Sequence, residues 1–237
     1  MKTNDIIFAD LSTYTPQKTI AFYETIFEWK YYKSDDYFVA HKEFNEIVGL
    51  YATPDKFKAM GMPHFWMTYI QVNDVEQTVK IAKEMGGIIE LVELGSPIGK
   101  IALIRDPQGA GFTIYEGDKL KTNREGGNAL VWSEIHVSNA AKVIPFYEAI
   151  FNWKFEKENP ATFKISNHKD EHIADIQEIP NEYKGKYEYW VCTFAVDNLE
   201  QKSKLILENG GELISEEDNR ILFTDNSGEA FFYLREK

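Results

Sequence analysis

The sequence predicts an α+β protein made of four copies of one β-α-β-β-β unit, and three observations lead to this prediction. Residues 20–33 and 144–157 are identical at nine of fourteen positions, at an offset of 124. The same offset relates residues 84–87 to residues 208–211. Each half of the chain also alternates twice between strand-like and helix-like hydrophobic periodicity. The 237 residues are therefore interpreted as two homologous halves.

The first unit begins with a strand predicted over residues 6–13, where apolar residues dominate. Thr15 is a plausible N-cap, and Pro16 suits the first helical position. The buried face of this helix is predicted from apolar residues at three- to four-residue spacing, Ile20, Tyr23 and Phe27. Two short strands are expected next, at residues 37–40 and 47–51.

The second unit starts with a strand predicted over residues 67–72. Asn73, followed three residues later by Glu76, is typical of a capping box, and Gly86 and Gly87 are expected to end the helix. The apolar face of this helix is predicted to consist of Val79, Ala82 and Met85. Three further strands are expected at 88–92, 100–104 and 112–115, with a turn at 106–109 before the last. The second half repeats this order.

The repeat divides the chain into a domain at residues 1–118, a linker at 119–128 and a domain at 129–237. The domains carry net charges of −6 (11 basic, 17 acidic) and −8 (12 basic, 20 acidic), and the linker carries +2. Two acidic domains argue against nucleic acid and anionic membranes as partners. No apolar run approaches the ~18–20 residues that span a bilayer. A lone Cys192 excludes an internal disulfide framework. We expect a cytoplasmic protein, either a monomer or a homodimer.

The order of elements resembles the vicinal oxygen chelate superfamily, which includes glyoxalase I, bleomycin-resistance proteins and extradiol dioxygenases. The residues that carry the match are Phe22-Tyr23 with the turn at 106–109, and Phe146-Tyr147 with the turn at 225–228. The resemblance covers nearly the whole chain and is greatest to tandem, two-domain glyoxalase-like proteins. It implies two domains, each an open, curled mixed sheet with helices outside and a ligand in the concave face. Because this fold hosts many activities, it does not fix the function.

The resemblance also implies four metal-ligand positions in each half for the metal-dependent members. In this sequence they fall on Phe8, Gly49, Met67 and Thr113, and on Trp132, Asp175, Val191 and Phe232. Among these residues only Asp175 offers a ligand suited to a hard metal ion, and a catalytic site needs at least three protein ligands. The expectation is a protein with no metal and no cofactor.

Two strand-borne carboxylates are the candidate reactive groups. Alternation along a strand places Asp10 and Ser12 on the face of Phe8, and Glu134 and His136 on the face of Trp132. Asp10, Glu134 and His136 are candidates for acid/base catalysis, although a buried carboxylate is also commonly satisfied by its own surroundings. The other four histidines are interpreted as surface or turn residues.

An apolar cavity with a few polar groups suits a small organic ligand. The predicted ligand-binding residues are Phe8, Asp10, Ser12, Met67, Thr113, Tyr115, Trp132, Glu134, His136, Asp175 and Phe232. The alternative is that these rings fill the barrel and leave no cavity.

The predicted function is metal-independent binding of a small organic molecule, for sequestration, resistance or sensing. Two alternatives stay open. One is a lactoylglutathione-lyase-like or dioxygenase-like enzyme, and the other is a metal-free acid/base enzyme that uses Glu134 and His136.

Overall fold

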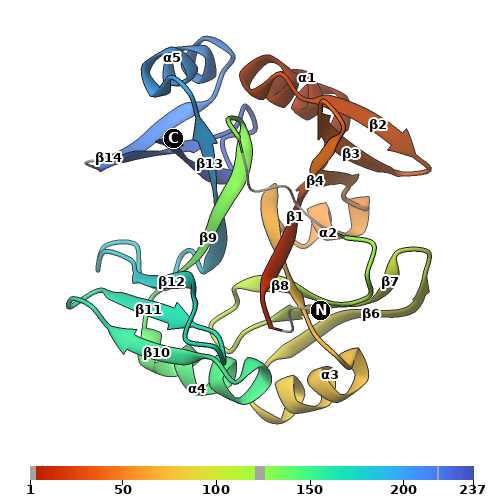
Figure 1. Cartoon of the computed structure of the whole chain (residues 1–237), viewed down its shortest axis with the longest axis vertical. Helices are drawn as coiled ribbons and strands as arrows, with labels where there is room; N and C mark the ends of the chain where they lie inside the picture. The colour runs from red at the N-terminus through yellow and green to blue at the C-terminus, as the bar shows by residue number, and fades with distance from the viewer. Residues whose placement is uncertain (1–3, 121–125, 218) are drawn as a thin grey trace. The chain divides into compact units, whose positions relative to one another are not determined.

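The computed structural model describes residues 4–120, 126–217 and 219–237 (Figure 1). The first half contains, in chain order, β1 (Ile6–Thr13), α1 (Pro16–Phe27), β2 (Lys30–Ser34), β3 (Tyr37–Lys42), β4 (Asn45–Ala52), α2 (Asp55–Ala59), β5 (Phe65–Gln71), α3 (Val75–Glu84), β6 (Ile88–Ser96), β7 (Gly99–Arg105) and β8 (Gly111–Glu116). Apart from the single-turn helix α2, this is the predicted β-α-β-β-β order, occurring twice.

The second half repeats that order. It contains β9 (Ala129–Val137), α4 (Ala140–Phe151), β10 (Lys154–Lys157), β11 (Thr162–Ser166), β12 (His172–Glu178), β13 (Tyr189–Val196), α5 (Leu199–Glu208), β14 (Glu212–Glu217), β15 (Arg220–Thr224) and β16 (Phe231–Glu236). The predicted α+β class, with four β-α-β-β-β units, is confirmed. No helix among the described residues is long and apolar enough to cross a membrane.

The strands form two mixed, eight-stranded sheets, one in each half of the sequence. Their strand orders are β2-β3-β4-β1-β5-β8-β7-β6 and β10-β11-β12-β9-β13-β16-β15-β14. Within each repeat unit the last strand returns parallel to the first, as in the pairs β1–β4 and β5–β8. The remaining strands of a unit are joined by antiparallel hairpins.

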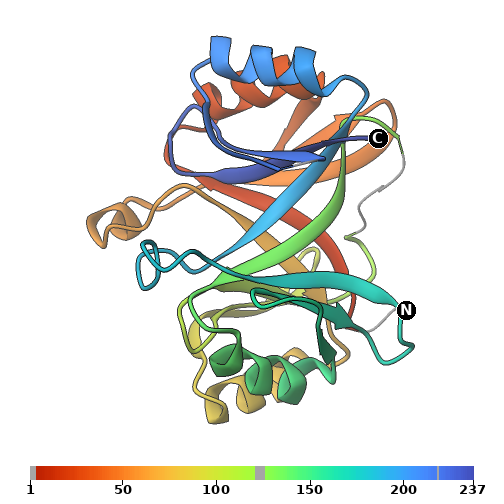
Figure 2. The same cartoon turned by 90° about the vertical axis from the view of Figure 1, so that its left-hand side faces the viewer.

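The compact units of the structure do not coincide with the two halves of the sequence. The α3/α4 unit consists of the described residues of 1–7, 68–120 and 133–191. The α1/α5 unit consists of the described residues of 8–67, 121–132 and 192–237. Both views show α3 beside α4, and α1 beside α5 (Figures 1 and 2). Each unit therefore combines one β-α-β-β-β copy from each half. Residues 121–125 of the predicted linker lie outside the described residues.

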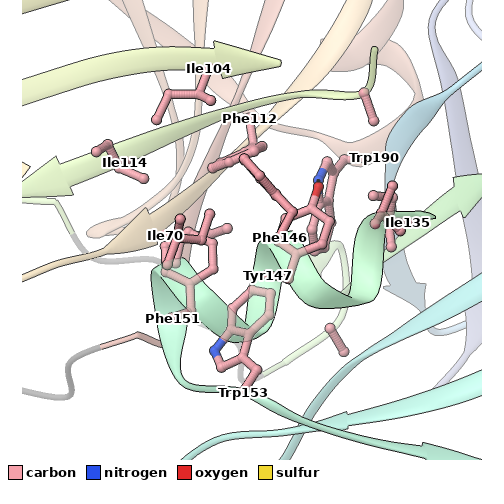
Figure 3. Close-up of a cluster of buried hydrophobic side chains, with 14 of the residues drawn as sticks. Ile70, Ile104, Phe112, Ile114, Ile135, Phe146, Tyr147, Phe151, Trp153 and Trp190 are labelled. Atoms are coloured by element: carbon pink, nitrogen blue, oxygen red, sulfur yellow. The ribbon is translucent and has the colours of Figure 1, made fainter. Parts of the chain in front are cut away.

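The core of the α3/α4 unit joins the helix-facing sides of strands from both halves. Ile70 and Ile114 project from β5 and β8 toward Phe146 and Phe151 of α4 (Figure 3). Alternation explains the choice of residues, since positions two apart along a strand share one face. Burial of a large apolar side chain contributes roughly 1.5–3 kcal/mol, so this shared core is a major stabilising term for the unit.

The α1/α5 unit is built in the same way. Leu11 of β1 and Phe22 of α1 lie in one buried cluster with Phe194 of β13. The Phe27 ring of α1 is 5.0 Å from the Phe194 ring, measured between centroids. Aromatic contacts at this distance are favourable beyond simple burial of area. The first and last repeat units of the chain thus complete one core.

A buried hydrogen-bond chain fixes a turn of one half to a helix of the other. The Asp106 side chain accepts hydrogen bonds from the backbone N–H groups of Gln108, Gly109 and Ala110, at 2.8–3.2 Å. The Tyr147 hydroxyl donates to Asp106 Oδ2 at 3.1 Å and accepts from Trp190 Nε1 at 3.2 Å. In the other unit Trp66 Nε1 donates to the Tyr23 hydroxyl at 3.2 Å. The Phe-Tyr signature and the Asp turn are therefore parts of the packing that joins the halves.

Several local predictions need correction. The N-cap of α3 is Asp74, whose Oδ1 accepts from Gln77 N at 2.9 Å, and not Asn73. Thr15 does occupy the N-cap of α1, but its side chain makes no capping hydrogen bond. The residues of strand β2 were not assigned and helix α2 was not expected, because exposed, charged sequences show no clear apolar period.

Candidate functional site

The polar candidates of the second half lie on the side of the sheet that faces away from α4. On β9 and β12, Ile135 and Ile176 are buried in the core on the helix side. Glu134 and Asp175, each one residue earlier, are directly opposite each other in the parallel pairing of β9 and β12. Alternation therefore places both carboxylates on the other face, together with His136.

Glu134, His136 and Tyr189 form a hydrogen-bonded chain on this face. His136 Nε2 is 2.7 Å from Glu134 Oε1, and His136 Nδ1 is 3.1 Å from the Tyr189 hydroxyl. The imidazole and phenol rings lie 5.0 Å apart between centroids. Glu134 and His136 are both buried. The sequence paired these two residues correctly and missed Tyr189.

The protonation states in this chain follow from its partners. Burial, and next the Glu134 carboxylate, raise the pKa of Tyr189 well above its ordinary value, so the phenol keeps its proton. The two ring nitrogens of His136 are therefore each engaged, Nε2 by Glu134 and Nδ1 by the Tyr189 hydroxyl, which holds the imidazole in one orientation.

A second pair continues the polar row toward solvent. His172 Nε2 lies 2.7 Å from Asp175 Oδ1. The exposed fractions of the side chains fall from 37% at His172 to 21% at Asp175 and 2% at Glu134. Asp175 is thus the carboxylate of this row that reaches the surface. His172 lies at the surface, as expected, at the start of β12, where it pairs with Asp175.

The first half presents different chemistry on the equivalent face. Asp10 on β1 lies opposite Gly49 on β4. The Tyr37 hydroxyl of β3 donates to Asp10 Oδ2 at 3.2 Å. A Cβ placed on Gly49 would collide with the Tyr37 phenol and would lie 2.9 Å from the Asp10 Cβ. The Tyr37 side chain therefore fills the space that a side chain at position 49 would occupy.

The rest of that face is built from hydroxyl groups. Ser12 Oγ and Thr53 Oγ1 are 2.5 Å apart. Burial, and next the Asp10 carboxylate, raise the pKa of Tyr51, while a hydrogen bond with Ser12 opposes the rise. Burial also holds the pKa of Tyr37 well above its ordinary value, with Asp10 as the second cause. Both phenols stay protonated at neutral pH, and the Tyr37 phenol donates to the buried Asp10 side chain.

The residues of the first half do not fit the divalent metal that the resemblance implies. Phe8 and Met67 have no hard donor, and Gly49 has no side chain. Thr113 offers one neutral hydroxyl, which leaves the set short of the three ligands that a catalytic ion requires. The space beside Gly49 is taken by Tyr37.

The residues of the second half do not fit a divalent metal either. One of them, Phe232, was also assigned to the wrong position. Strand pairing places Cys192 opposite Phe232 and Thr193 opposite Tyr233. In the first half Tyr69, the equivalent of Thr193, lies opposite Thr113. The position of Thr113 is therefore taken by Tyr233, while Phe232 lies in the helix-side core.

A longer turn explains the error over Phe232. Asp106 N bonds Ala110 O, whereas Asp225 N bonds Ala230 O, one residue further along. The extra residue shifts the strand by one position, which exchanges its two faces. Among residues 4–120, 126–217 and 219–237, no three His, Cys, Asp or Glu side chains are grouped so that they would hold a metal ion.

The other predicted residues are placed as follows. Thr113 lies on β8, opposite Tyr69 and Leu103. Phe8, Met67 and Tyr115 are buried, and Trp132 is partly buried. The Tyr115 hydroxyl donates to Ile98 O at 2.7 Å and accepts from Lys119 N at 3.0 Å, so it ties down local backbone.

Tyr37, Tyr189 and His172 are the residues of these faces that the sequence did not reveal. Tyr189 lies two residues before Val191, so alternation from that position would have placed it on the correct face. Tyr37 reaches Asp10 through a hairpin whose register shifts at Ala40 and His41, and no sequence pattern predicts that shift.

Comparison with known proteins gives consistent results. Residues 7–114 match the family model "Glyoxalase/Bleomycin resistance protein/Dioxygenase superfamily". The chain is 29% identical over 227 residues to "Putative glyoxylase CFP32" of Mycobacterium tuberculosis, which covers 88% of this chain and 84% of that protein.

Solved structures show the same fold. The 2,3-dioxygenase LapB from Pseudomonas sp. KL28 superposes with a TM-score of 0.66 at 15% identity, over 100% of this chain and 94% of that one. The Mn(II)-bound glyoxalase from Novosphingobium aromaticivorans superposes with a TM-score of 0.65 at 11% identity, over 99% and 82%. With the fourfold β-α-β-β-β order, the chain shares the fold of both structures, and its residues 7–114 match the model of the glyoxalase/bleomycin resistance/dioxygenase superfamily.

Proposed function

We propose that this protein is a member of that superfamily and binds a small organic molecule without the divalent metal that many members use. One observation carries the proposal: the scaffold is complete, but the positions expected to hold the metal carry Phe8, Gly49, Met67 and Thr113 in the first half. In the second half they carry Trp132, Asp175, Val191 and Tyr233. Neither set supplies three nitrogen or carboxylate ligands.

The groups at and beside the expected metal-ligand positions suit recognition of a neutral or cationic molecule. Tyr, Trp and Met side chains offer apolar contact, while Asp10, Asp175 and Glu134 offer acceptors for hydroxyl or ammonium groups. The acidic balance of the chain, −12 overall, favours encounter with a neutral or cationic molecule over an anionic one.

A thermal-unfolding screen with and without EDTA tests this function. The probes are phenols, catechols and aromatic amines, chosen because related structures include catechol-cleaving dioxygenases. At least one compound is expected to raise the unfolding temperature, by the same amount in EDTA as in its absence, since a ligand of the folded state stabilises it by mass action. A response that EDTA abolishes, or no response to the whole panel, would refute the proposal.

A second candidate is metal-free acid/base catalysis, favoured by the Glu134–His136–Tyr189 chain. A carboxylate that accepts from an oriented imidazole is able to take up and return a proton through that ring. The similarity to a protein named a glyoxylase makes the methylglyoxal–glutathione adduct the first compound to assay.

The catalytic candidate makes a separable prediction. Turnover of the adduct, if catalysed by this chain of residues, proceeds in EDTA and falls by ~10²–10⁴-fold in Glu134→Gln, the usual contribution of a general base. Asp170→Asn, a change of an exposed carboxylate, is the matched control. Absence of turnover, or equal turnover in Glu134→Gln, removes this candidate and leaves the binding proposal untouched.

A further inference from the structure

We infer that only the second half of the chain admits a ligand to its polar sheet face, because Tyr37 has closed the equivalent face of the first half. The inference deepens the proposed function and depends on it for the role of the bound molecule. The occupant that fits the open face is a small molecule with an ammonium or hydroxyl donor.

The two faces are equivalent by strand register as well as by sequence. Asp10 lies opposite Gly49 in the first half, and Glu134 lies opposite Asp175 in the second. One strand further out, Tyr37 lies opposite Tyr51, and Thr162 lies opposite Gln177. Tyr37 and Thr162 therefore hold the same position, and a large phenol has been exchanged for a small hydroxyl.

In the first half the large side chain closes the face. The Tyr37 phenol lies where a Cβ at Gly49 would be, and its hydroxyl donates to Asp10. Asp10 is 1% exposed and its equivalent Glu134 is 2% exposed, so the halves differ at the outer position, where Gly49 is covered by Tyr37 and Asp175 is exposed. The glycine and the tyrosine are complementary, since any side chain at position 49 would displace the ring. A ligand that approaches Asp10 from this strand edge has to displace Tyr37 first.

In the second half the small side chain turns away from the carboxylates. The Thr162 hydroxyl donates to Gln177 Oε1 at 2.7 Å, along its own register pair. Asp175 replaces the glycine and keeps 21% of its side chain exposed, beside His172 at 37%. Behind them lies the buried Glu134, bonded to His136. Hydrogen-bond acceptors therefore extend from Asp175 at the surface to Glu134 in the interior.

The charges on this path indicate the chemical class of ligand. Asp175 and Glu134 are carboxylates on neighbouring strands, and a carboxylate acts as an acceptor only. A donor group that binds between them gains two charge-assisted hydrogen bonds, which are stronger than neutral ones. Lys164 of β11 lies opposite Asp175, so this face carries one cation against two carboxylates, and an anionic ligand would meet the excess of acidic groups. The open face thus suits an amine or a polyhydroxylated molecule of small size.

Carboxylate labelling of the folded, full-length chain tests this asymmetry and requires no knowledge of the natural ligand. The probe is glycine ethyl ester, a small amine coupled by a water-soluble carbodiimide and located by peptide mass spectrometry. We expect a label on Asp175 and on the exposed control Asp170, and none on Asp10. In urea all three become labelled.

Three variants separate the filling of space from the hydrogen bond. Tyr37→Thr, which copies the second half, is expected to raise labelling of Asp10 about tenfold by removing the cover. Tyr37→Phe keeps the ring and is expected to leave Asp10 unlabelled. Thr162→Tyr, the reverse exchange, is expected to lower labelling of Asp175. Circular dichroism confirms that each variant is folded.

Two results would overturn the inference. One is equal labelling of Asp10 and Asp175 in the unaltered chain, and the other is an unlabelled Asp10 in folded Tyr37→Thr. The labelling pattern is read without any ligand, so failure of the thermal-unfolding screen refutes the proposed function alone. An inverted labelling pattern refutes the asymmetry alone.

Discussion

At the scale of single residues, Gly49 shows how a change of one side chain alters a whole sheet face. Its missing side chain makes room for the Tyr37 phenol, which then bonds to the Asp10 carboxylate. In the equivalent place of the second half, Asp175 coexists with the smaller Thr162. The two halves thus differ at both positions of this pair, while the neighbouring carboxylates Asp10 and Glu134 are buried in both halves.

Gly49→Ala is expected to destabilise the protein by roughly 1–3 kcal/mol, the usual cost of overpacking a buried site. The added methyl group collides with the Tyr37 ring. Urea unfolding measures the change. Gly95→Ala is the control, because a Cβ there has no atom within 4 Å. Addition of Tyr37→Thr is expected to restore part of the loss, and a double variant no more stable than Gly49→Ala would contradict the steric account.

The His136 site shows which residue-scale features a sequence reveals. Alternation along one strand correctly paired Glu134 with His136, since both positions lie on one element. Tyr189 joins them from β13, and Tyr37 reaches Asp10 from β3. Contacts between strands depend on strand register and on how far each side chain reaches. The periodicity of a single sequence does not give the register.

At the scale of elements, the turns that carry Asp106 and Asp225 each bury a carboxylate, and this burial changes the pKa of that carboxylate. Burial raises the pKa of Asp106, and hydrogen bonds from Gln108, Gly109, Ala110 and Tyr147 oppose the rise. Asp225 behaves alike, with burial as the first cause and Ser227, His64 and Tyr23 opposing. Each turn keeps its carboxylate in the core because the backbone N–H groups of the turn need an acceptor there.

Asp106→Asn is expected to flatten the pH dependence of stability. A folded pKa above the ordinary value of 3.8 means that the folded chain binds more protons than the unfolded chain as soon as pH exceeds that value. The contribution of Asp106 to the free energy of unfolding therefore falls as pH rises from about 4 through the folded pKa. The asparagine variant does not titrate there and lacks this decrease.

Urea unfolding between about pH 4 and about pH 8 measures this difference. The gap between the unaltered chain and Asp106→Asn should shift in favour of the variant as pH rises. Asp225→Asn, in the other unit, is the matched comparison and should behave alike. A gap that stays constant across this range would contradict the titration account.

The elements also show where pattern reading failed. The start of α3 was assigned one residue too early, because Asn73 and Asp74 are both good cap residues and only the backbone geometry selects between them. Phe232 of β16 was assigned to the wrong face of the sheet, because the preceding turn is one residue longer than in the first half. One extra residue moves every following side chain of a strand to the opposite face. The order of strands and helices was still predicted correctly, because periodicity over many residues identifies an element even when its start is misplaced by one residue.

At the scale of the whole molecule, the repeat in the sequence and the assembly of the cores follow different divisions. Hydrogen-bonded sheets respect the two halves, whereas buried clusters combine the second repeat unit with the third, and the first with the fourth. The offset of 124 revealed the copies, but α1, α3, α4 and α5 each carry an apolar face, and no sequence pattern predicts which of them pair. We propose that the halves 1–118 and 129–237 evolved as domains and are now interdependent in stability.

The central proposal for the molecule is that this scaffold works without the divalent metal that the resemblance to the vicinal oxygen chelate superfamily implies. The most direct test is metal analysis of the full-length protein, purified without chelator from cells grown with added Ni, Zn, Fe and Mn, then dialysed. The account predicts no stoichiometric metal, since neither half supplies three suitable ligands. About one equivalent of any of these ions per chain, lost together with ligand binding when EDTA is added, would contradict it.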